Sequence, residues 1–223
     1  MCEAMRSLCR PRRGLAGHNG PVTTSSWDDS YAGNVPPPWD IGRPQPAFLR
    51  LAGQGLLAGH VLDAGCGTGE HTLLAASSGA DALGIDGSSL AIEQARGKAA
   101  ERGIEARFEV ADALSLADLG LSFEVVIDSG LFHVFDDDSR ARYVASLASV
   151  LRPGGRLYLM CFSDRQPGEL GPRRVSQDEL RAAFADGWSI SAIQADTFDL
   201  NRGVFDDTVA QAWLATISRA AAA

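Results

Sequence analysis

Cysteine is scarce in this sequence of 223 residues, and long apolar runs are absent. The four cysteines show neither CxxC spacing nor a histidine-rich partner segment, so the sequence indicates no zinc site and no disulfide framework. No segment is long and apolar enough to span a bilayer, and the arginine-containing N-terminus lacks the apolar region of a secretory signal. We therefore expect a cytoplasmic protein with no metal and no membrane partner.

Basic residues are also fewer than acidic residues. The 20 Lys and Arg residues are outnumbered by 28 Asp and Glu residues, and the resulting formal net charge of -8 repels a phosphate backbone. Nucleic acid is therefore not an expected partner. The length of the chain and its 45% hydrophobic content suit one domain with a full core, and we expect a monomer or weak homodimer that acts on a small molecule.

The beginning of the sequence differs from the rest. Residues 1–26 are basic, contain Gly and Pro and show no hydrophobic periodicity, so they are predicted to be a disordered tail. The alternative is that these residues are an artefact of an upstream start codon and do not belong to the native protein. The folded domain is predicted to span residues 27–223.

Strand-like and helix-like segments alternate through this domain. The predicted strands are residues 60–64, 82–86, 106–110, 124–128, 156–162, 189–198 and 208–218. The predicted helices are residues 70–78, 88–102, 138–151 and 176–184, with a turn at residues 153–155. Alternating units predict an α/β fold with a parallel, doubly wound, Rossmann-like sheet, and the two final strands predict an antiparallel hairpin at one edge.

The most informative segment is VLDAGCGTG at residues 61–69. Asp63 ends a buried strand, and Gly65, Gly67 and Gly69 follow at alternate positions. Such glycines allow close approach of a ligand and are expected to expose backbone amides at the start of a helix. The GxGxG spacing differs from the GxGxxG of NAD and FAD sites and argues against a dinucleotide. The alternative is a tight turn that binds nothing.

Acidic residues after the next two strands extend this pattern. Asp86 ends the second strand, where a carboxylate can accept hydrogen bonds from both hydroxyls of a ribose. Asp112 and Ala113 follow the third strand, where a carboxylate and a backbone amide can bind the amino group and a ring nitrogen of adenine.

These motifs together resemble those of class I S-adenosylmethionine-dependent methyltransferases. The segments that carry the resemblance are VLDAGCGTGEHTLLAA, GIDGS, ADAL, FEVVIDSGLFHVF and LRPGGRLYLMCFSD, between about residues 57 and 164. The resemblance implies a seven-stranded sheet of order 3-2-1-4-5-7-6 with strand 7 antiparallel, and S-adenosyl-L-methionine (SAM) as the cofactor. Its predicted contacts are Trp39, Asp63, Gly65, Gly67, Asp86, Asp112, Ala113 and Asp128.

A second, local resemblance concerns residues 27–48. This segment is similar to the N-terminal segment of thiopurine methyltransferase-like and related actinobacterial small-molecule methyltransferases, which folds over the cofactor as a lid. The resemblance implies that Trp27, Tyr31 and Trp39 flank the sulfonium or an aromatic acceptor. The alternative is that these aromatic residues only cover the edge of the sheet.

The acceptor side is predicted after the fourth strand. Asp128 and His133 follow this strand at the switch point where open α/β sheets bind ligands. A neutral imidazole can take a proton from an acceptor hydroxyl near neutral pH, so His133 is the predicted base and a predicted substrate contact; the alternative is a packing role within the turn. Arg174, beside Arg173, either binds an acidic acceptor or is a solvated loop charge.

The sequence therefore predicts an enzyme that transfers the methyl group of SAM to an oxygen, sulfur or nitrogen atom of a small molecule. A non-catalytic or regulatory SAM-binding protein of the same fold is the alternative.

Overall fold

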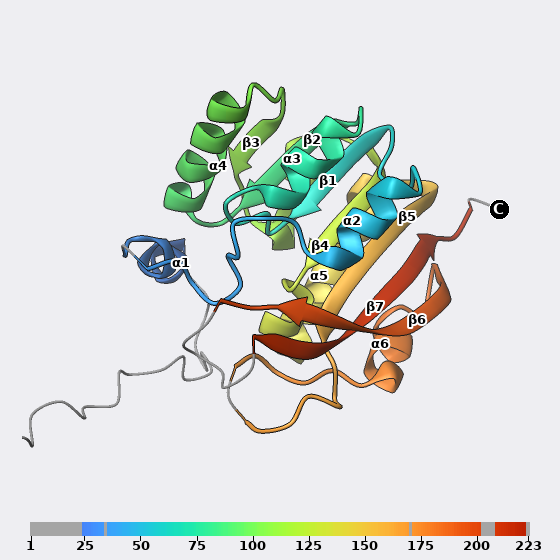
Figure 1. The fold of residues 1–223 in the computed structure, drawn as a ribbon. Coiled ribbons are helices and arrows are strands. Elements are labelled where there is room, and N and C mark those ends of the chain that lie inside the picture. Colours follow the sequence, from blue (N-terminus) through green and yellow to red (C-terminus); the bar gives the residue numbers. More distant parts are fainter. Residues whose placement is uncertain (1–23, 34, 170, 202–207, 222–223) are drawn as a thin grey trace, which may run out of the picture.

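The computed structural model describes residues 24–33, 35–169, 171–201 and 208–221, which form one mixed sheet with helices on both faces (Figure 1). The strands are β1 (His60–Ala64), β2 (Asp81–Asp86), β3 (Arg107–Val110), β4 (Phe123–Ser129), β5 (Leu151–Phe162), β6 (Trp188–Asp199) and β7 (Val209–Arg219). The helices are α1 (Thr24–Tyr31), α2 (Pro46–Gly53), α3 (Glu70–Ser77), α4 (Ser89–Arg102), α5 (Asp137–Val150) and α6 (Gln177–Ala183), with short 3-10 helices at Ala113–Leu119 and Phe132–Val134.

The strand order is β3-β2-β1-β4-β5-β7-β6, and β7 runs antiparallel to both of its neighbours. This order confirms the predicted topology, including the closing hairpin. Because β1 to β5 are parallel, their carboxyl ends lie at one edge of the sheet, where open α/β sheets bind ligands.

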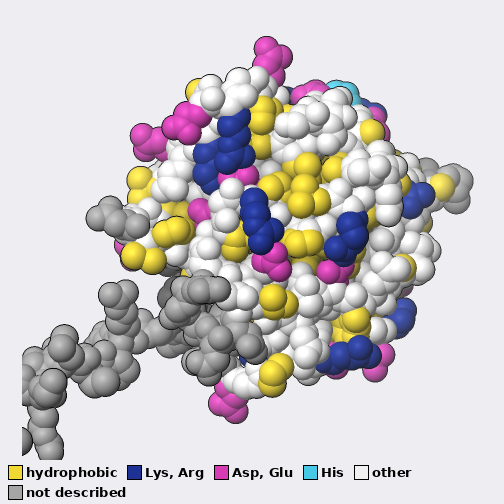
Figure 2. All heavy atoms as spheres, in the orientation of Figure 1, with side chains coloured by type: hydrophobic (Ala, Val, Ile, Leu, Met, Phe, Trp, Pro, Cys, Tyr) yellow, Lys and Arg dark blue, Asp and Glu magenta, His cyan; other side chains and the backbone are white. Residues whose placement is uncertain are grey.

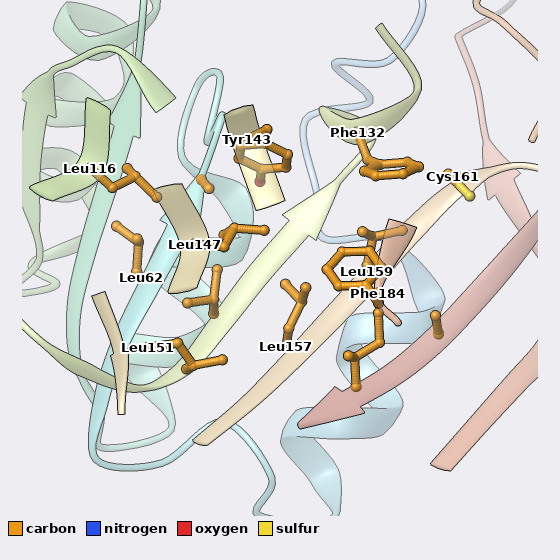
Figure 3. Close-up of a cluster of buried hydrophobic side chains, with 14 of the residues drawn as sticks. Leu62, Leu116, Phe132, Tyr143, Leu147, Leu151, Leu157, Leu159, Cys161 and Phe184 are labelled. Carbon is orange, nitrogen blue, oxygen red and sulfur yellow. The ribbon is translucent and has the colours of Figure 1, made fainter. Parts of the chain in front are cut away.

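The period of two along each strand divides the core between the two faces. Val61 contributes to a buried cluster with α2, whereas its neighbour Leu62 belongs to a cluster with α5 on the other face. Figure 3 shows the second cluster, in which Tyr143 and Leu147 from α5 lie against the sheet. Burial on both faces explains why β1 and β4 read as continuous apolar runs.

Local signals set the ends of several helices as predicted. Ser88 caps α4 by accepting from the amide of Ala91, and Gly103 ends the helix in a left-handed conformation. Ser176 and Glu179 form the predicted capping box of α6. Among the described residues, no helix combines the length and the apolar character needed to cross a bilayer.

The structure corrects two predicted boundaries. The predicted helix over residues 138–151 ends at Val150, and β5 begins at Leu151 instead of after a turn at residues 153–155. These residues form a bulge, since the register with β4 shifts between Phe123 and Val125, and a bulge tolerates proline within a strand.

At the N-terminus, α1 begins at Thr24, inside the predicted disordered tail, and the remaining tail residues lie outside the described part of the chain. Helix α2 is absent from the predicted helices. The contacts that hold α1 come from α4, far along the chain, and a local pattern does not record them.

Candidate active site

The glycine turn between β1 and α3 is packed against other parts of the protein. Gly65, Gly67 and Gly69 all have positive φ, at 72°, 52° and 87°. A Cβ atom at Gly67 would lie 2.9 Å from the hydroxyl oxygen of Tyr31, and one at Gly65 would lie 3.1 Å from Leu131. Glycine is therefore needed here for both the backbone conformation and the close approach of Tyr31 and Leu131.

Three amides of this turn have partners inside the protein. The Cys66 amide donates to the Ile85 carbonyl at 2.8 Å, and the Gly67 amide donates to Asp86 Oδ2 at 2.9 Å. The Gly69 amide donates to the Cys66 carbonyl at 2.9 Å. The expectation that the turn exposes its amides to a ligand is therefore wrong for these three groups.

Asp86 joins the glycine turn to the start of α4. Its Oδ1 accepts from the Ser88 amide at 2.8 Å, while Oδ2 accepts from Gly67. Burial is the main cause that raises the pKa of this carboxyl. A carboxylate has about four acceptor positions, and the amides of Gly67 and Ser88 do not fill all of them.

Asp63 carries an acceptor without a partner. The side chain is 1% exposed, and its Oδ2 accepts from the Thr72 hydroxyl at 2.7 Å. Its Oδ1 has no partner among the described residues, and burial raises the pKa of the carboxyl to about 7. A buried carboxylate oxygen with no donor fits a ligand that brings one, such as the ammonium group of a methionine moiety.

Asp112 and Ala113 lie at the same edge, beyond β3. Asp86 is paired with Val110, so Asp112 lies two residues past that pair and remains exposed. It caps the following 3-10 helix by accepting from the Leu114 amide at 2.9 Å. The structure thus places the predicted adenine-binding residues next to the predicted ribose-binding residue.

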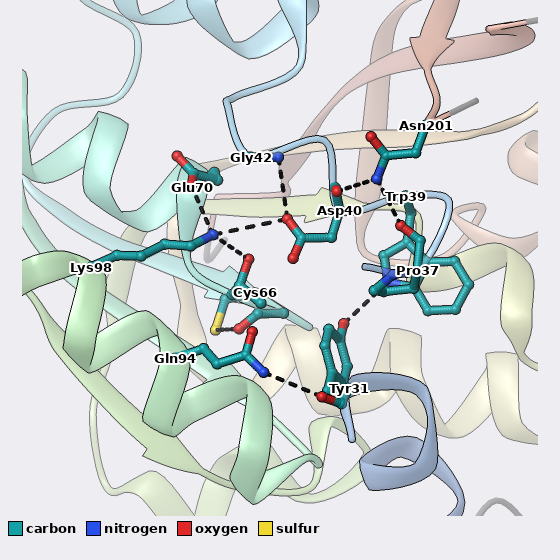
Figure 4. Close-up of polar contacts among 12 residues, drawn as sticks. Tyr31, Pro37, Trp39, Asp40, Gly42, Cys66, Glu70, Gln94, Lys98 and Asn201 are labelled. Atoms are coloured by element: carbon teal, nitrogen blue, oxygen red, sulfur yellow. Dashed lines mark hydrogen bonds and ion pairs between the residues drawn. The ribbon is translucent and has the colours of Figure 1, made fainter. Parts of the chain in front are cut away.

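The segment before α2 lies over the glycine turn. Asp28 fastens α1 to α4, because its carboxylate accepts from the hydroxyl of Ser88 at 2.6 Å and from the amide of Leu90 at 3.3 Å. Trp39 donates from Nε1 to the Tyr31 hydroxyl at 3.1 Å (Figure 4), and burial raises the pKa of that phenol well above its usual value. Tyr31 and Trp39 therefore sit over the turn together.

Trp27, also on α1, lies beside the β2–α4 turn. A Cβ atom at Gly87 would be 3.7 Å from Cδ1 of Trp27. The three predicted aromatic residues are thus all on the side of the glycine turn and of Asp86, although Trp39 remains 37% exposed.

The other end of this segment is held by the hairpin of β6 and β7. Asn201 donates from its amide to the Pro38 carbonyl at 2.8 Å and from its side chain to the carbonyls of Pro37 and Asp40. Gln45 and Asp199 exchange two hydrogen bonds of 2.9 and 2.8 Å. A hollow of about 410 Å³ remains between α4, this segment and Asn201; its lining includes Tyr31, Pro37, Asp40, Gln94, Lys98 and Asn201, as Figure 4 shows in part.

Basic side chains on the face of Figure 2 lie next to acidic ones, with hydrophobic side chains between them. Arg43 pairs with Asp199 at 2.7 Å, and Arg102 pairs with Glu70 at 2.8 Å. These pairs neutralise positive charge locally.

His133 is buried in an aromatic group after β4. Its ring meets Phe162 at 5.1 Å and Phe198 at 6.0 Å, both edge-on, and it is 7% exposed. Its Nδ1 accepts from the Phe162 amide at 2.9 Å. A neutral imidazole has one acceptor nitrogen and one N–H, so the proton must lie on Nε2.

This arrangement does not support the predicted role of His133 as a base. Burial, followed by the charges of Arg140 and Arg174, lowers the pKa of His133 to about 3. The one lone pair that could take a proton is already engaged by the Phe162 amide. The ring can instead donate a hydrogen bond.

Asp128 and Arg174 also differ from expectation. Asp128 is fully buried and accepts from the amides of Leu131 and Phe132 and from the hydroxyl of Tyr143, so its carboxylate is satisfied within the protein and stabilises the turn. Arg174 donates to four backbone carbonyls, those of Gln166, Pro167, Gly168 and Pro172, and thereby holds its own loop.

The residues that sequence reasoning missed are Asp28, Asn201, Arg140, Phe162 and Phe198. Each reaches the site through tertiary contacts between distant parts of the chain. Ser88 carries a local signal as the cap of α4, but that signal concerns the Ala91 amide and does not reveal its contact with Asp28.

The sheet order, the glycine turn and the carboxylates at the ends of β1 and β2 define a class I methyltransferase architecture with a SAM site. The family described as "Methyltransferase domain" matches residues 61–155. A 2-heptyl-1-hydroxyquinolin-4(1H)-one methyltransferase of Mycobacteroides abscessus is 37% identical over 194 residues, which cover 83% of this chain and 86% of that protein.

Two solved structures are similar as well. One, reported for "Conversion of a Disulfide Bond into a Thioacetal Group during Echinomycin Biosynthesis", is 39% identical with a TM-score of 0.80 and covers 89% of this chain and 93% of its own. Magnesium protoporphyrin IX methyltransferase of Synechocystis PCC 6803 with bound SAH is 23% identical with a TM-score of 0.61, covers 78% of this chain and 80% of its own, and shows the same fold. The chain therefore belongs to the class I SAM-dependent methyltransferases; its cofactor is SAM and its acceptor a small molecule.

Proposed function

We propose that this methyltransferase acts on a planar aromatic small molecule and methylates an oxygen atom borne by its ring. The observation that supports it is the buried aromatic group of His133, which follows β4, Phe162 at the carboxyl end of β5 and Phe198 near the carboxyl end of β6. Aromatic side chains with one N–H donor suit a flat acceptor with a polar oxygen. The relative from Mycobacteroides abscessus is named for an acceptor of this type, a hydroxylated quinolinone.

The proposed cofactor contacts follow from the free acceptors of the site. Asp63 Oδ1 would receive the ammonium group of SAM, Asp86 the ribose hydroxyls, and Asp112 with Ala113 the adenine. Gly65 and Gly67 leave room for the methionine portion only when Tyr31 and Leu131 shift, since both side chains press on the turn. Asp128 and Arg174 are not proposed as ligand contacts.

The chain's own residues would contribute chiefly by positioning and by excluding water. The bound cofactor supplies an electrophilic methyl group. Asp28 and Asn201 hold the segment with Tyr31 and Trp39 over the turn from opposite sides. Fixing both reactants in one geometry can supply up to about 7 to 11 kcal/mol of the barrier reduction, which does not require a base.

The remaining expectations belong to the same proposal. The acidic net charge and the unpaired, buried Cys66 and Cys161 support a cytoplasmic enzyme that does not act on nucleic acid. A monomer or weak homodimer is part of the same proposal.

A sulfur acceptor is the second candidate, because the structure of 39% identity is reported for a reaction at a disulfide. A thiolate is a weaker hydrogen-bond acceptor than an oxygen anion, so the N–H of His133 favours oxygen.

The test measures S-adenosylhomocysteine formed with a panel of N-hydroxyquinolinones, phenols, thiols and amines. We expect kcat/KM to be highest for an aromatic hydroxyl compound. Turnover of thiols alone would refute the oxygen proposal. Saturable binding of SAM with no turnover on any acceptor would instead support the non-catalytic alternative.

A further inference from the structure

The protonation of His133 is fixed by its surroundings. The Phe162 amide donates to Nδ1, which leaves the ring proton on Nε2. No described residue accepts a hydrogen bond from Nε2. Among the described residues, the fully buried polar atoms without a hydrogen-bond partner are on Asp63, Arg140 and Tyr158, and Nε2 of His133 is not one of them. His133 is 7% exposed, so this N–H remains for a ligand or water.

Gly130 lies beside Nε2 of His133. Gly130 has φ of +93°, and a Cβ atom there would lie 3.4 Å from both Nε2 and Cε1 of His133. The same Cβ would lie 3.7 Å from Cζ of Phe198. The positive φ favours glycine at position 130, and without a Cβ this edge of the imidazole has more room between the backbone after β4 and the ring of Phe198.

The charges around His133 are positive. Arg140 lies on α5 with its guanidinium over the Phe132 ring at 4.7 Å, and its Nη2 is buried without a partner among the described residues. Arg174 lies over the Phe162 ring at 5.6 Å. Both charges disfavour a second proton on His133.

The acidic groups nearby are turned elsewhere. The Asp128 carboxylate is occupied by the amides of Leu131 and Phe132 and by Tyr143. Glu179 on α6 pairs with Arg140 at 3.3 Å but also with Arg173. The surrounding charges therefore favour a negatively charged hydrogen-bond partner for the Nε2 N–H of His133.

We propose that His133 donates a hydrogen bond from Nε2 to an oxygen anion of the acceptor, so that the enzyme selects acceptors whose hydroxyl ionises before the methyl transfer. This inference rests on the oxygen acceptor proposed above. The acceptor loses its proton to water. A lone pair of its oxygen then forms the C–O bond as the C–S bond of the sulfonium breaks, so an anion and a cation yield a neutral ether and a neutral thioether.

The proposal makes the pH dependence a property of the acceptor. If His133 were a base, kcat/KM would rise with the same enzyme pKa for every acceptor. If His133 is a donor, the rise follows each acceptor's own pKa, because only the ionised form reacts. A hydroxyl compound of pKa about 6 and a matched one of pKa about 9 separate the two cases, since their profiles should be displaced by about three pH units.

The first experiment uses the wild-type protein, so it does not depend on a variant that folds. Histidine 15N spectra, with His133→Gln used only for assignment, report which nitrogen carries the proton. We expect a neutral ring protonated at Nε2 from pH 5 to 8.5. A ring that titrates near pH 6.5, or that carries its proton on Nδ1, would overturn the proposal.

The second experiment compares kcat/KM for the two hydroxyl compounds in wild type and His133→Phe. Phe retains an aromatic ring but removes the donor, and circular dichroism verifies its fold. We expect a loss of 10-fold or more in kcat/KM for both compounds above their pKa, with unchanged SAM binding. An unchanged value, or pH profiles that coincide for the two acceptors, would refute the donor role.

The outcomes also separate this inference from the proposed function. Wild-type protein that methylates thiols and no hydroxyl compound contradicts the oxygen acceptor, whatever the tautomer of His133. Wild-type protein that methylates hydroxyl compounds with coincident pH profiles upholds the oxygen acceptor and contradicts the donor role alone.

Discussion

Asp63→Asn should stabilise the cofactor-free protein at pH 8 and at the same time weaken its binding of SAM. The Asp63 side chain is 1% exposed, Oδ1 has no partner among the described residues, and burial raises the pKa of the carboxyl from its usual value of 3.8 to about 7. Between these two values the folded state holds a proton that the unfolded state has lost, so stability falls as the pH rises.

The size of the effect follows from the displacement of the pKa. At about 1.4 kcal/mol per unit, a rise of about three units costs at most about 4 kcal/mol above pH 7, and about 3 kcal/mol of that is lost between pH 5 and pH 8. Asparagine removes the charge and can still accept from the Thr72 hydroxyl. Its amide N–H groups need acceptors, so we expect a net gain of about 1 to 3 kcal/mol at pH 8.

Urea unfolding of wild type and variant at pH 5 and pH 8 tests this expectation, with calorimetry of SAM binding alongside. Asp118→Asn, which removes one charge at an exposed position, is the matched control and should change stability by less than about 0.5 kcal/mol at either pH. A variant that is less stable than wild type at pH 8, or a difference that does not depend on pH, would show that the Asp63 carboxylate is not held without a donor.

Three further changes probe the contacts around the turn. Asp86→Asn should weaken SAM binding by about 1 to 3 kcal/mol and should also lower the melting temperature, because Asp86 accepts from the amides of Gly67 and Ser88. An unchanged affinity in calorimetry would contradict the ribose contact. Gly67→Ala should lower the free energy of unfolding in urea by about 1 to 3 kcal/mol, and adding Tyr31→Phe should restore part of this loss, because the phenol oxygen is the atom that a Cβ would meet. No recovery would mean that backbone strain alone causes the loss. Asp28→Ala should raise the KM for SAM and speed proteolysis between residues 32 and 45, whereas the exposed Asp29→Ala should do neither; equal effects would exclude a specific tie to α4.

The sheet and its edge were predictable because their signals are local. Each buried strand of the parallel part reads as a short apolar run, and Asp63 and Asp86 occupy the last or next-to-last position of β1 and β2. Parallel strands end at the same edge, so residues that follow them must come together. The order of the strands was not written in these runs; it came from the resemblance to class I methyltransferases.

The segment before α2 was predictable only in part. Its aromatic residues pointed to a lid, and the structure places Tyr31 against Gly67. The contacts that hold the segment join Asp28 to Ser88 and Asn201 to Pro37, across about 60 and more than 160 residues of chain. Hydrogen bonds over such separations have no periodicity, so no local pattern in the sequence could reveal them.

Sequence position also failed to predict the direction of side chains after β4. Asp63 and Asp128 both lie near the end of a buried strand, and both were predicted to face the cofactor. The first amides of the 3-10 helix that begins at Phe132 need acceptors outside the helix. The Asp128 carboxylate accepts from the amides of Leu131 and Phe132. With Tyr143 as a further donor, Asp128 is satisfied internally, whereas Asp63 has only Thr72. The number of donors within the protein therefore decides which of two similar carboxylates keeps an acceptor without a partner, and among the described residues that acceptor is Asp63 Oδ1.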